Sequence, residues 1–172
     1  MTDAAPPPTV SATDPDWSRE RCRGWWDPPR RLLRAIRGHQ RARARRGPLA
    51  AVVRRWWTVQ HRLWSVVTQA DIPATTRIGG GLLLPHPNGV VIHPDTTIGP
   101  NCLIFQQVTL GTRASTPGAP RIGGHVDIGA GARILGPVTI GDHAVIGANA
   151  VVLCDVPAGA SARGVPARVH PR

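Results

Sequence analysis

The 172-residue sequence contains no lysine and no tyrosine, and phenylalanine and methionine each occur once. All 21 basic residues are therefore arginines, and with ten acidic residues the formal net charge is +11. The absence of lysine is typical of a GC-rich coding background and excludes no class of function. No run of about 18 apolar residues occurs either, so the sequence predicts no membrane-spanning helix.

Cysteine is also scarce: Cys22, Cys102 and Cys154 are far apart and form no CxxC pair. This spacing argues against a disulfide framework and against a zinc site, so we expect no metal. Free thiols suit a reducing compartment, and we expect the cytoplasm. The segment MTDAAPPPTVSATDPD lacks the basic and apolar parts of a signal peptide. We expect residues 1–16 to be a disordered tail.

The composition changes near residue 70. Fourteen arginines and all six tryptophans lie between Trp17 and Trp64. Residues 17–70 are predicted to form an Arg/Trp-rich helical region, because Pro28 suits the first turn of a helix. Gly47 and the proline after it separate the segment RRLLRAIRGHQRARARR from LAAVVRRWWTVQHRLWSVV, whose apolar residues recur at helical spacing.

Three kinds of partner are conceivable for this basic helical region. It contains no recognisable nucleic-acid motif, so we expect no nucleic-acid partner. A basic amphipathic helix with Trp56, Trp57 and Trp64 suits peripheral contact with an anionic membrane surface. The interpretation we favour is packing, in which the tryptophans dock on the rest of the chain or on sister chains.

From Asp71 onward, aliphatic residues recur at every sixth position, often followed by glycine. The positions are Ile72, Ile78, Leu84, Ile92, Ile98, Ile104, Leu110, Ile122, Ile128, Ile134, Ile140, Ile146 and Val152. A six-residue period predicts a solenoid whose coils have three flat sides, with Ile92 stacked on Leu110 and Ile122 on Ile140. Residues 111–121 interrupt the pattern and are predicted to leave the solenoid as a loop.

This hexapeptide pattern resembles the acyltransferases with a left-handed parallel β-helix, and within them serine acetyltransferase. The matching stretches are DIPATTRIG, LPHPNGVVI, IFQQVTLG, IGAGARILGPVTIGDHAVIGANAVV and DVPAGASARGVPARV. The resemblance implies a mainly β fold over residues 71–172, a left-handed parallel β-helix preceded by a short α-helical region. It also implies a homotrimer or a dimer of trimers, with the active site between adjacent chains.

The implied reaction is CoA-dependent O-acetylation, in which acetyl-CoA donates acetyl to a small hydroxyl acceptor. An alcohol needs a general base, and histidine titrates in the right range. The resemblance assigns that role to His86, with Asp71 as the carboxylate that orients it or stabilises the imidazolium. His93, His125 and His143 occupy repeat corners and are interpreted as structural.

The resemblance also implies where CoA binds. Small residues hold the pantetheine arm through backbone amides, the thioester lies near the start of the loop, and arginines meet the phosphates. The corresponding residues are Gly111, Thr112, Ala130, Ala148, Arg163 and Arg168.

The expected acceptor site departs from the family pattern. An Arg-His pair that grips the acceptor carboxylate is replaced by Gly118 and Ala119, and an aspartate before the base is replaced by Pro85. The candidate acceptor-binding residues are Arg113, Arg121 and Gln106. L-serine, as in cysteine biosynthesis, is the favoured acceptor.

Two alternatives remain open. The short helical region and the missing grip also resemble a branch of the family linked to exopolysaccharide synthesis, which makes a sugar hydroxyl the second candidate acceptor. The non-enzymatic alternative is a membrane-associated β-helix scaffold.

Overall fold

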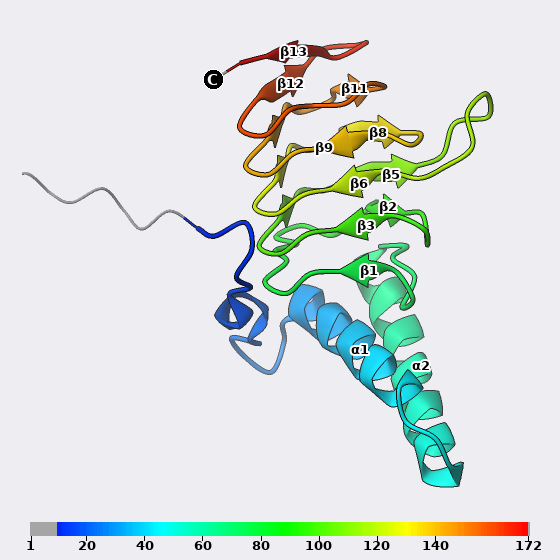
Figure 1. Ribbon diagram of the computed structural model, residues 1–172. Coiled ribbons are helices and arrows are strands. Elements are labelled where there is room, and N and C mark those ends of the chain that lie inside the picture. The colour runs from blue at the N-terminus through cyan, green and yellow to red at the C-terminus, as the bar shows by residue number, and fades with distance from the viewer. Residues whose placement is uncertain (1–9, 172) are drawn as a thin grey trace, which may run out of the picture.

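The computed structural model describes residues 10–171 as a three-sided β-helix that stands on a pair of helices (Figure 1). A short 3-10 turn, Trp17–Glu20, precedes helices α1 (Pro28–Arg43) and α2 (Pro48–Thr68). Both helices begin with proline, whose fixed φ and missing N–H suit a first helical turn. Gly47, with a φ of 107°, makes the turn between them.

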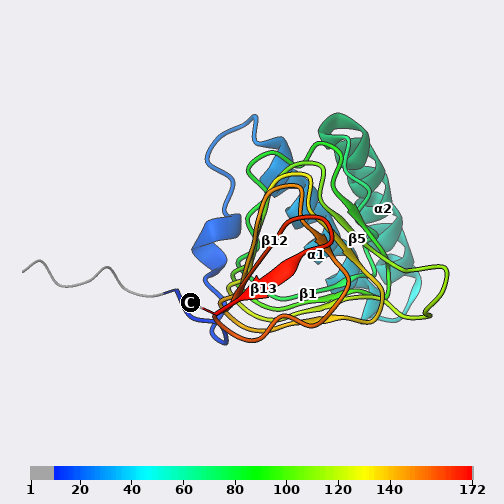
Figure 2. The same cartoon turned by 90° about the horizontal axis from the view of Figure 1, so that it is seen from above.

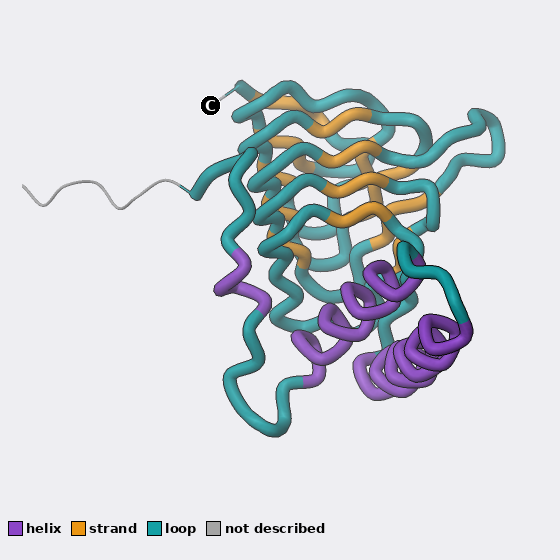
Figure 3. Tube along the Cα trace, turned by 60° about the horizontal axis from the view of Figure 1, so that its bottom comes forward, coloured by secondary structure: helices purple, strands orange, loops and turns teal. Residues whose placement is uncertain are grey.

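The two helices pack against each other and close the base of the β-helix (Figure 3). A Cβ at Gly38 of α1 would overlap the Trp57 ring of α2, so this glycine permits the close approach. On another face of α1, Leu32, Leu33 and Ile36 are fully buried in the same core cluster as the β-helix interior. Helix α1 therefore covers the apolar end that the first coil would otherwise expose.

The strands form three parallel sheets, one on each side of the coil. We name the sheets faces A, B and C. Face A contains β2 (Val91–Ile92), β5 (Thr109–Gly111), β8 (Arg133–Leu135) and β11 (Val151–Val152). Face B contains β1 (Arg77–Ile78), β3 (Thr97–Ile98), β6 (Arg121–Ile122) and β9 (Thr139–Ile140). Face C contains β4 (Leu103–Ile104), β7 (Asp127–Ile128), β10 (Val145–Ile146), β12 (Ser161–Arg163) and the antiparallel β13 (Arg168–His170).

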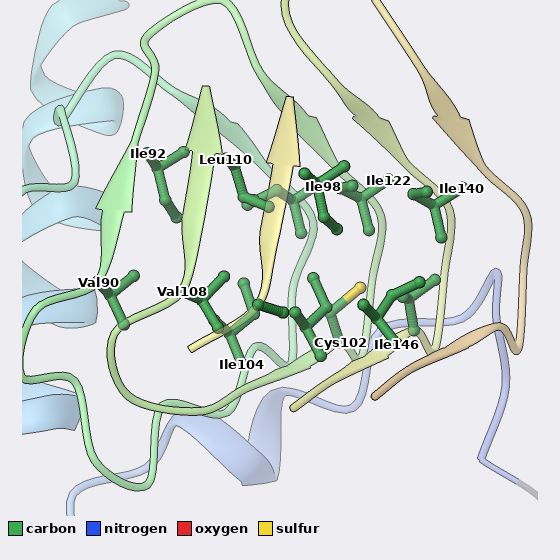
Figure 4. Packing of buried hydrophobic residues seen from close by; sticks show 14 of the residues in the cluster. Val90, Ile92, Ile98, Cys102, Ile104, Val108, Leu110, Ile122, Ile140 and Ile146 are labelled. Carbon is green, nitrogen blue, oxygen red and sulfur yellow. The ribbon is translucent and has the colours of Figure 1, made fainter. Parts of the chain in front are cut away.

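The hexad residues point inward and stack from coil to coil (Figure 4). Ile92 pairs with Leu110 and Ile122 with Ile140, as the six-residue period predicts. The second residue of each two-residue strand is buried, and the first is less so. The predicted fold class, a left-handed parallel β-helix preceded by a short helical region, is confirmed.

The coils turn at three edges, which we call the A–B, B–C and C–A edges after the faces they join. Viewed down the axis, the coils form a triangle, and one loop projects from a corner (Figure 2). This loop joins β5 to β6 and contains most of residues 111–121, as predicted. Its base lies on the A–B edge.

Part of the expected disordered tail lies against the β-helix. The side chain of Asn101, on the B–C edge, donates to the carbonyls of Ser11 and Asp14 at 2.7 and 2.8 Å. Its amide oxygen accepts the N–H of Asp16 at 2.8 Å. One side chain thus satisfies three backbone groups of residues 10–16, which explains why this part of the tail is ordered. Residues 1–9 lie outside the described residues.

Helix α2 exposes an apolar stripe on its outer side. Its members, each between 49% and 77% exposed, are Leu49, Val52, Trp56, Val59, Leu63 and Val66. Trp57 and Trp64 are only partly exposed, because Trp57 lies on Gly38 and Trp64 packs against the core. Within residues 10–171, neither helix is long and apolar enough to cross a bilayer.

The burial of Cys102 predicts that its thiol is unreactive in the native protein. Cys102 is fully buried, and this burial raises the pKa of its thiol to about 11, whereas Cys22 and Cys154 are exposed. Because alkylation requires the thiolate, iodoacetamide at pH 8 should modify two thiols in the native protein and three after unfolding. Mass spectrometry of the intact protein counts the adducts. A third adduct that forms in the native protein as fast as the first two would contradict the burial of Cys102.

Candidate active site

His86 lies on the C–A edge of the first coil, in the turn between Leu84 and Val90. Its side chain is exposed, so solvent and ligands can reach it. The turn is tied to the end of helix α2. The carbonyl of Gln69 accepts the N–H of Gly89 at 2.8 Å, and the side chains of Gln69 and Asn88 are hydrogen-bonded. Gln69 has a φ of 54°, which turns the chain at the end of α2 and aims its carbonyl at this turn.

Asp71 lies close to the same turn, at the start of face A on the first coil. Its N–H donates to the Val90 carbonyl at 2.8 Å, and its carbonyl accepts the N–H of Ile92 at 2.9 Å. The backbone therefore fixes Asp71 near the end of the turn that carries His86. No hydrogen bond or ion pair joins the two side chains among residues 10–171. Catalytic hydrogen bonds often tighten only when substrate is bound.

A column of corner residues rises from this turn along the C–A edge. Its members, on successive coils, are Asn88, Gln106, Ala130 and Ala148. The carbonyl of each of the first three accepts the N–H of the residue that follows the next member. Because neighbouring strands are about 4.8 Å apart, Ala148 lies about 14 Å above Asn88. The structure thus brings three residues expected to bind CoA or acceptor onto the edge of the β-helix that carries His86.

The N–H groups along this column are available to a ligand. In the part of the chain that the structure describes, no hydrogen bond uses the N–H of Gln106, Ala130 or Ala148. The side-chain oxygen of Gln106 is buried and has no partner there. Ala148 is exposed and Ala130 is half-buried, so these N–H groups are accessible, while the buried Gln106 oxygen is an acceptor. Among the described residues, the edge thus offers three donors and one acceptor to an extended amide-containing molecule.

Two arginines stand at the upper end of the C–A edge. Arg163 of β12 pairs with Arg168 of β13, and both side chains are exposed. The Cγ atom of Arg163 lies 3.2 Å from where a Cβ of Gly147 would be, which places Arg163 beside the column. The pair thus provides positive charge at the end opposite His86.

The remaining expected site residues lie on the other edge of face A. Gly111 ends β5, and Thr112 and Arg113 start the loop on the A–B edge. The Cδ atom of Arg113 is 3.0 Å from where a Cβ of Gly136 would be, so its stem packs on the next coil. Arg121 is exposed on face B. Within one chain, face A therefore separates these residues from His86.

The other histidines of the β-helix lie away from the C–A edge. His93 is on the A–B edge, where its Nδ1 atom accepts the N–H of Asp95 at 3.3 Å. His125 and His143 are on the B–C edge, with φ angles of 50° and 60° and their Nδ1 atoms 2.8 Å apart. Of His86, His93, His125 and His143, only His86 lies on the C–A edge, at the foot of this column.

Two residues that support the site are not recognisable as such in the sequence. Gln69 and Asn88 hold the His86 turn, and both look like ordinary loop residues in the sequence. The only available signal was position, because Gln69 directly follows the last helical apolar pattern and a residue there ends the helix. No residues in the described part of the chain form a group of three or more metal-ligating side chains.

The chain is similar to known acyltransferases in sequence. The family pattern of bacterial transferase hexapeptide (six repeats) matches residues 119–154. Serine acetyltransferase of Synechococcus elongatus is 41% identical over 106 residues, which are 60% of this chain and 43% of that protein. The Salmonella typhimurium enzyme is 45% identical over 107 residues, 61% of this chain and 39% of that protein. The resemblance to serine acetyltransferase is confirmed.

Solved structures extend the similarity to the fold. A serine acetyltransferase in complex with CoA superimposes with a TM-score of 0.69 and 32% identity, covering 85% of this chain and 58% of that one. Soybean serine acetyltransferase complexed with serine has a TM-score of 0.68 and 39% identity, covering 81% and 56%. The chain spans less than two thirds of the length of each of these relatives.

The His125–His143 pair predicts a pH dependence of stability. Burial lowers the pKa of His125; Asp127 opposes this effect, and the charges of His143 and Arg19 add to it. Since the unfolded ring titrates near 6.5, the unfolded chain binds more protons below that pH. The contribution to stability is therefore complete above about pH 6.5 and decreases as the pH falls further.

Thermal melting of the wild type and of His125→Asn between pH 7.5 and pH 5 measures this effect. Asparagine tolerates the positive φ, so it is a matched control for the fold. The Tm of the wild type should fall more steeply with acidification than that of the variant. Parallel Tm curves for the two proteins would show that the pair contributes nothing.

Proposed function

We propose that this chain is a CoA-dependent O-acetyltransferase that transfers acetyl from acetyl-CoA to a hydroxyl, with L-serine as the favoured acceptor. The observation that carries the proposal is the C–A edge, where an exposed histidine stands at the foot of a column of unpaired N–H groups. The named relatives are serine acetyltransferases, and one of them is described as a complex with CoA and another with serine.

The proposed chemistry is direct attack. His86 takes the proton of the acceptor hydroxyl as the oxygen bonds to the thioester carbonyl carbon. The tetrahedral intermediate then collapses, the carbon–sulfur bond breaks, and the imidazolium returns the proton to the departing thiolate. A thioester is already activated, so no covalent acyl-enzyme is required. The two products are the acetyl ester and CoA.

Asp71 supports the base in this mechanism. Two hydrogen bonds hold the main chain of Asp71 near the His86 turn, where the charge of its exposed carboxylate stabilises the imidazolium that forms during attack. Gln106, with its unpaired side-chain oxygen, is the nearest candidate on the column to contact the reacting groups.

The C–A edge also fits the cosubstrate. The unpaired N–H groups of Ala130 and Ala148 suit the amide carbonyls of a pantetheine arm, and their small side chains leave the backbone accessible. At the upper end, Arg163 and Arg168 suit phosphate groups, which guanidinium binds with paired donors. An acetyl-CoA molecule laid along this edge has its phosphates above and its thioester near His86.

A second chain supplies the loop in this proposal. Gly111, Thr112 and Arg113 lie across face A from His86, so they join a site with it only when copies pack side by side. We therefore propose the homotrimer, or a dimer of trimers, with sites between adjacent chains. The exposed stripe of α2 has the three- and four-residue spacing of a helix-pairing surface and supports packing against a sister chain.

A sugar hydroxyl is the second candidate acceptor. The observation that favours it is the loop sequence, where Gly118 and Ala119 provide no side chain to hold an amino acid. An exopolysaccharide role remains a prediction from this departure. Peripheral membrane contact through α2 and a cytoplasmic location, suggested by the unpaired cysteines, also remain predictions.

His86→Ala should abolish most of the transfer activity. Loss of a general base lowers kcat by about 10²–10⁴-fold, while CoA affinity should stay unchanged because the column is intact. CoA-thiol release from acetyl-CoA measures kcat, and calorimetry measures CoA binding. His143→Asn is the matched control, since His143 lies on the B–C edge, away from both the column and the loop, and it should retain activity within about two-fold. Wild-type turnover by His86→Ala would refute the proposed mechanism.

Subunit complementation tests the shared site. One variant carries His86→Ala, and the other carries a loop shortened between Thr112 and Ala119. Each alone should be inactive. Mixed in equal amounts and reassembled, they should recover about a quarter of wild-type activity, because random assembly places an intact histidine beside an intact loop in that share of sites. If the mixture stays inactive although sedimentation shows mixed oligomers, the loop and the histidine do not meet across chains.

A further inference from the structure

A cavity of about 310 Å³ lies between the N-terminal segment and the first coil of the β-helix. One side of it consists of consecutive residues from the first coil, and the other side is rich in arginine. The lining residues are Arg19, Arg23, Pro29, Arg30, Leu33, Leu82, Leu83, Leu84 and Pro85. The coil side ends at Pro85, which directly precedes His86. The cavity therefore reaches the turn that carries the proposed base.

The lining of the cavity contains three arginines and no acidic residue. Arg30 forms an ion pair with Asp27 at 3.2 Å. Burial alone would raise the pKa of Asp27, but the backbone N–H of Arg23 and the charge of Arg30 lower it, so this carboxylate is ionised. Neither Arg19 nor Arg23 takes part in an ion pair among residues 10–171. Two guanidinium groups are thus left to attract an anion.

The side chain of Arg19 also contains an unpaired hydrogen-bond donor. Its Nε atom is buried and makes no hydrogen bond within the described residues. A buried donor without a partner is unfavourable, and an anionic oxygen in the cavity would satisfy it. The carbonyl of Arg19 is occupied, because it accepts the Nε of Arg30 at 3.0 Å.

The N-terminal segment is held firmly enough to serve as a wall. Glu20 accepts the N–H groups of Gly81 and Leu82 at 2.8 and 3.2 Å. Its two oxygens also accept hydrogen bonds from Arg37, at 2.8 and 3.1 Å, and this pair is nearly buried. Arg37 in turn donates to the carbonyls of Ile78 and Gly79. Since Arg19 directly precedes Glu20, these contacts fix its backbone beside the first coil before any ligand binds.

The sequence around the base is consistent with an anionic ligand. Pro85 stands where the resembling family carries an aspartate, so the rim of the cavity lacks a carboxylate that would repel an anion. Arg113 and Arg121, the candidates expected from sequence, lie on the A–B edge and on face B of this chain. Arg19 and Arg23 instead line the cavity whose coil side ends at Pro85, the residue before His86.

We propose that Arg19 and Arg23 bind the anionic group of the acceptor, a carboxylate or a phosphate, and hold its hydroxyl toward His86. The inference rests on the proposed function and names the acceptor class: a hydroxyl compound that carries a negative charge. The cavity is at the small end of ligand pockets, so it takes a compact acceptor or the anionic end of a larger one. Paired guanidinium donors supply both the affinity and the orientation.

Steady-state kinetics on the full chain test this assignment. The acceptors are L-serine, which carries a carboxylate, glucose 1-phosphate, which carries a phosphate, and uncharged glucose. The variants are Arg19→Gln, Arg23→Gln and the control Arg45→Gln, whose side chain is exposed and lines none of these walls. For the anionic acceptor that reacts, KM should rise by about ten-fold in the two wall variants, with kcat within about two-fold, since charge-assisted hydrogen bonds are lost.

The control should keep the KM of the wild type. If glucose reacts, its KM should be the same in the wild type and in all three variants. Unchanged KM in both wall variants, or glucose used as well as either anion, overturns the inference. Glutamine at position 19 keeps the backbone carbonyl that holds Arg30, so the fold should be retained, and matched Tm values of the variants check this.

A binding measurement separates this inference from the proposed function. L-serine and glucose 1-phosphate are each added to the wild type, and the ligand-induced rise in Tm is compared with that of Arg19→Gln. A rise that is lost in Arg19→Gln, but kept in Arg45→Gln, supports the anion site even if no acceptor releases CoA thiol. Absence of CoA release with every acceptor would count against the acetyltransferase, and an equal Tm rise in all variants would count against the anion site.

Discussion

The stacking of one aliphatic side chain per side, repeated on every coil, is the interaction on which the rest of this structure depends. No single coil could bury its own apolar residues, but Ile92 on Leu110 and Ile122 on Ile140 form a core that continues through the β-helix. Because the core occupies the axis, the edges are free to vary. The register of the core then decides which edge residues form a column.

The candidate site residues lie on two different edges of the β-helix. The C–A edge carries His86 and the column that ends at Ala148, while the A–B edge carries the loop. A rigid prism cannot fold one edge onto another, so a site that needs both must be shared between copies. The helices and the N-terminal segment complete the arrangement: α1 closes the apolar base, Gln69 holds the His86 turn, and Glu20 holds the wall that contains Arg19.

Much of this could be predicted because the repeat is local. Each hexad position follows from the previous one, so the fold, the loop and the edge positions of Ala130 and Ala148 could be derived without knowing the rest of the chain. The candidate base came from a motif of nine residues. Arg19 and Arg23 could not be found this way, because they reach the first coil only through contacts between segments distant in sequence. In the sequence they are two of fourteen similar arginines.

The sequence by itself determined the β-helix, its register and the identity of the exposed histidine, since periodicity places side chains inside or outside a regular solenoid. It also determined what is missing, namely the carboxylate-gripping pair at Gly118 and Ala119. The tertiary structure decided which residues share an edge, that the loop and His86 stand apart within one chain, and which arginines line the cavity beside the His86 turn. Those relations depend on how separate segments pack. The N-terminal segment and the helices have no repeat, so no local sequence pattern predicts where they pack on the β-helix.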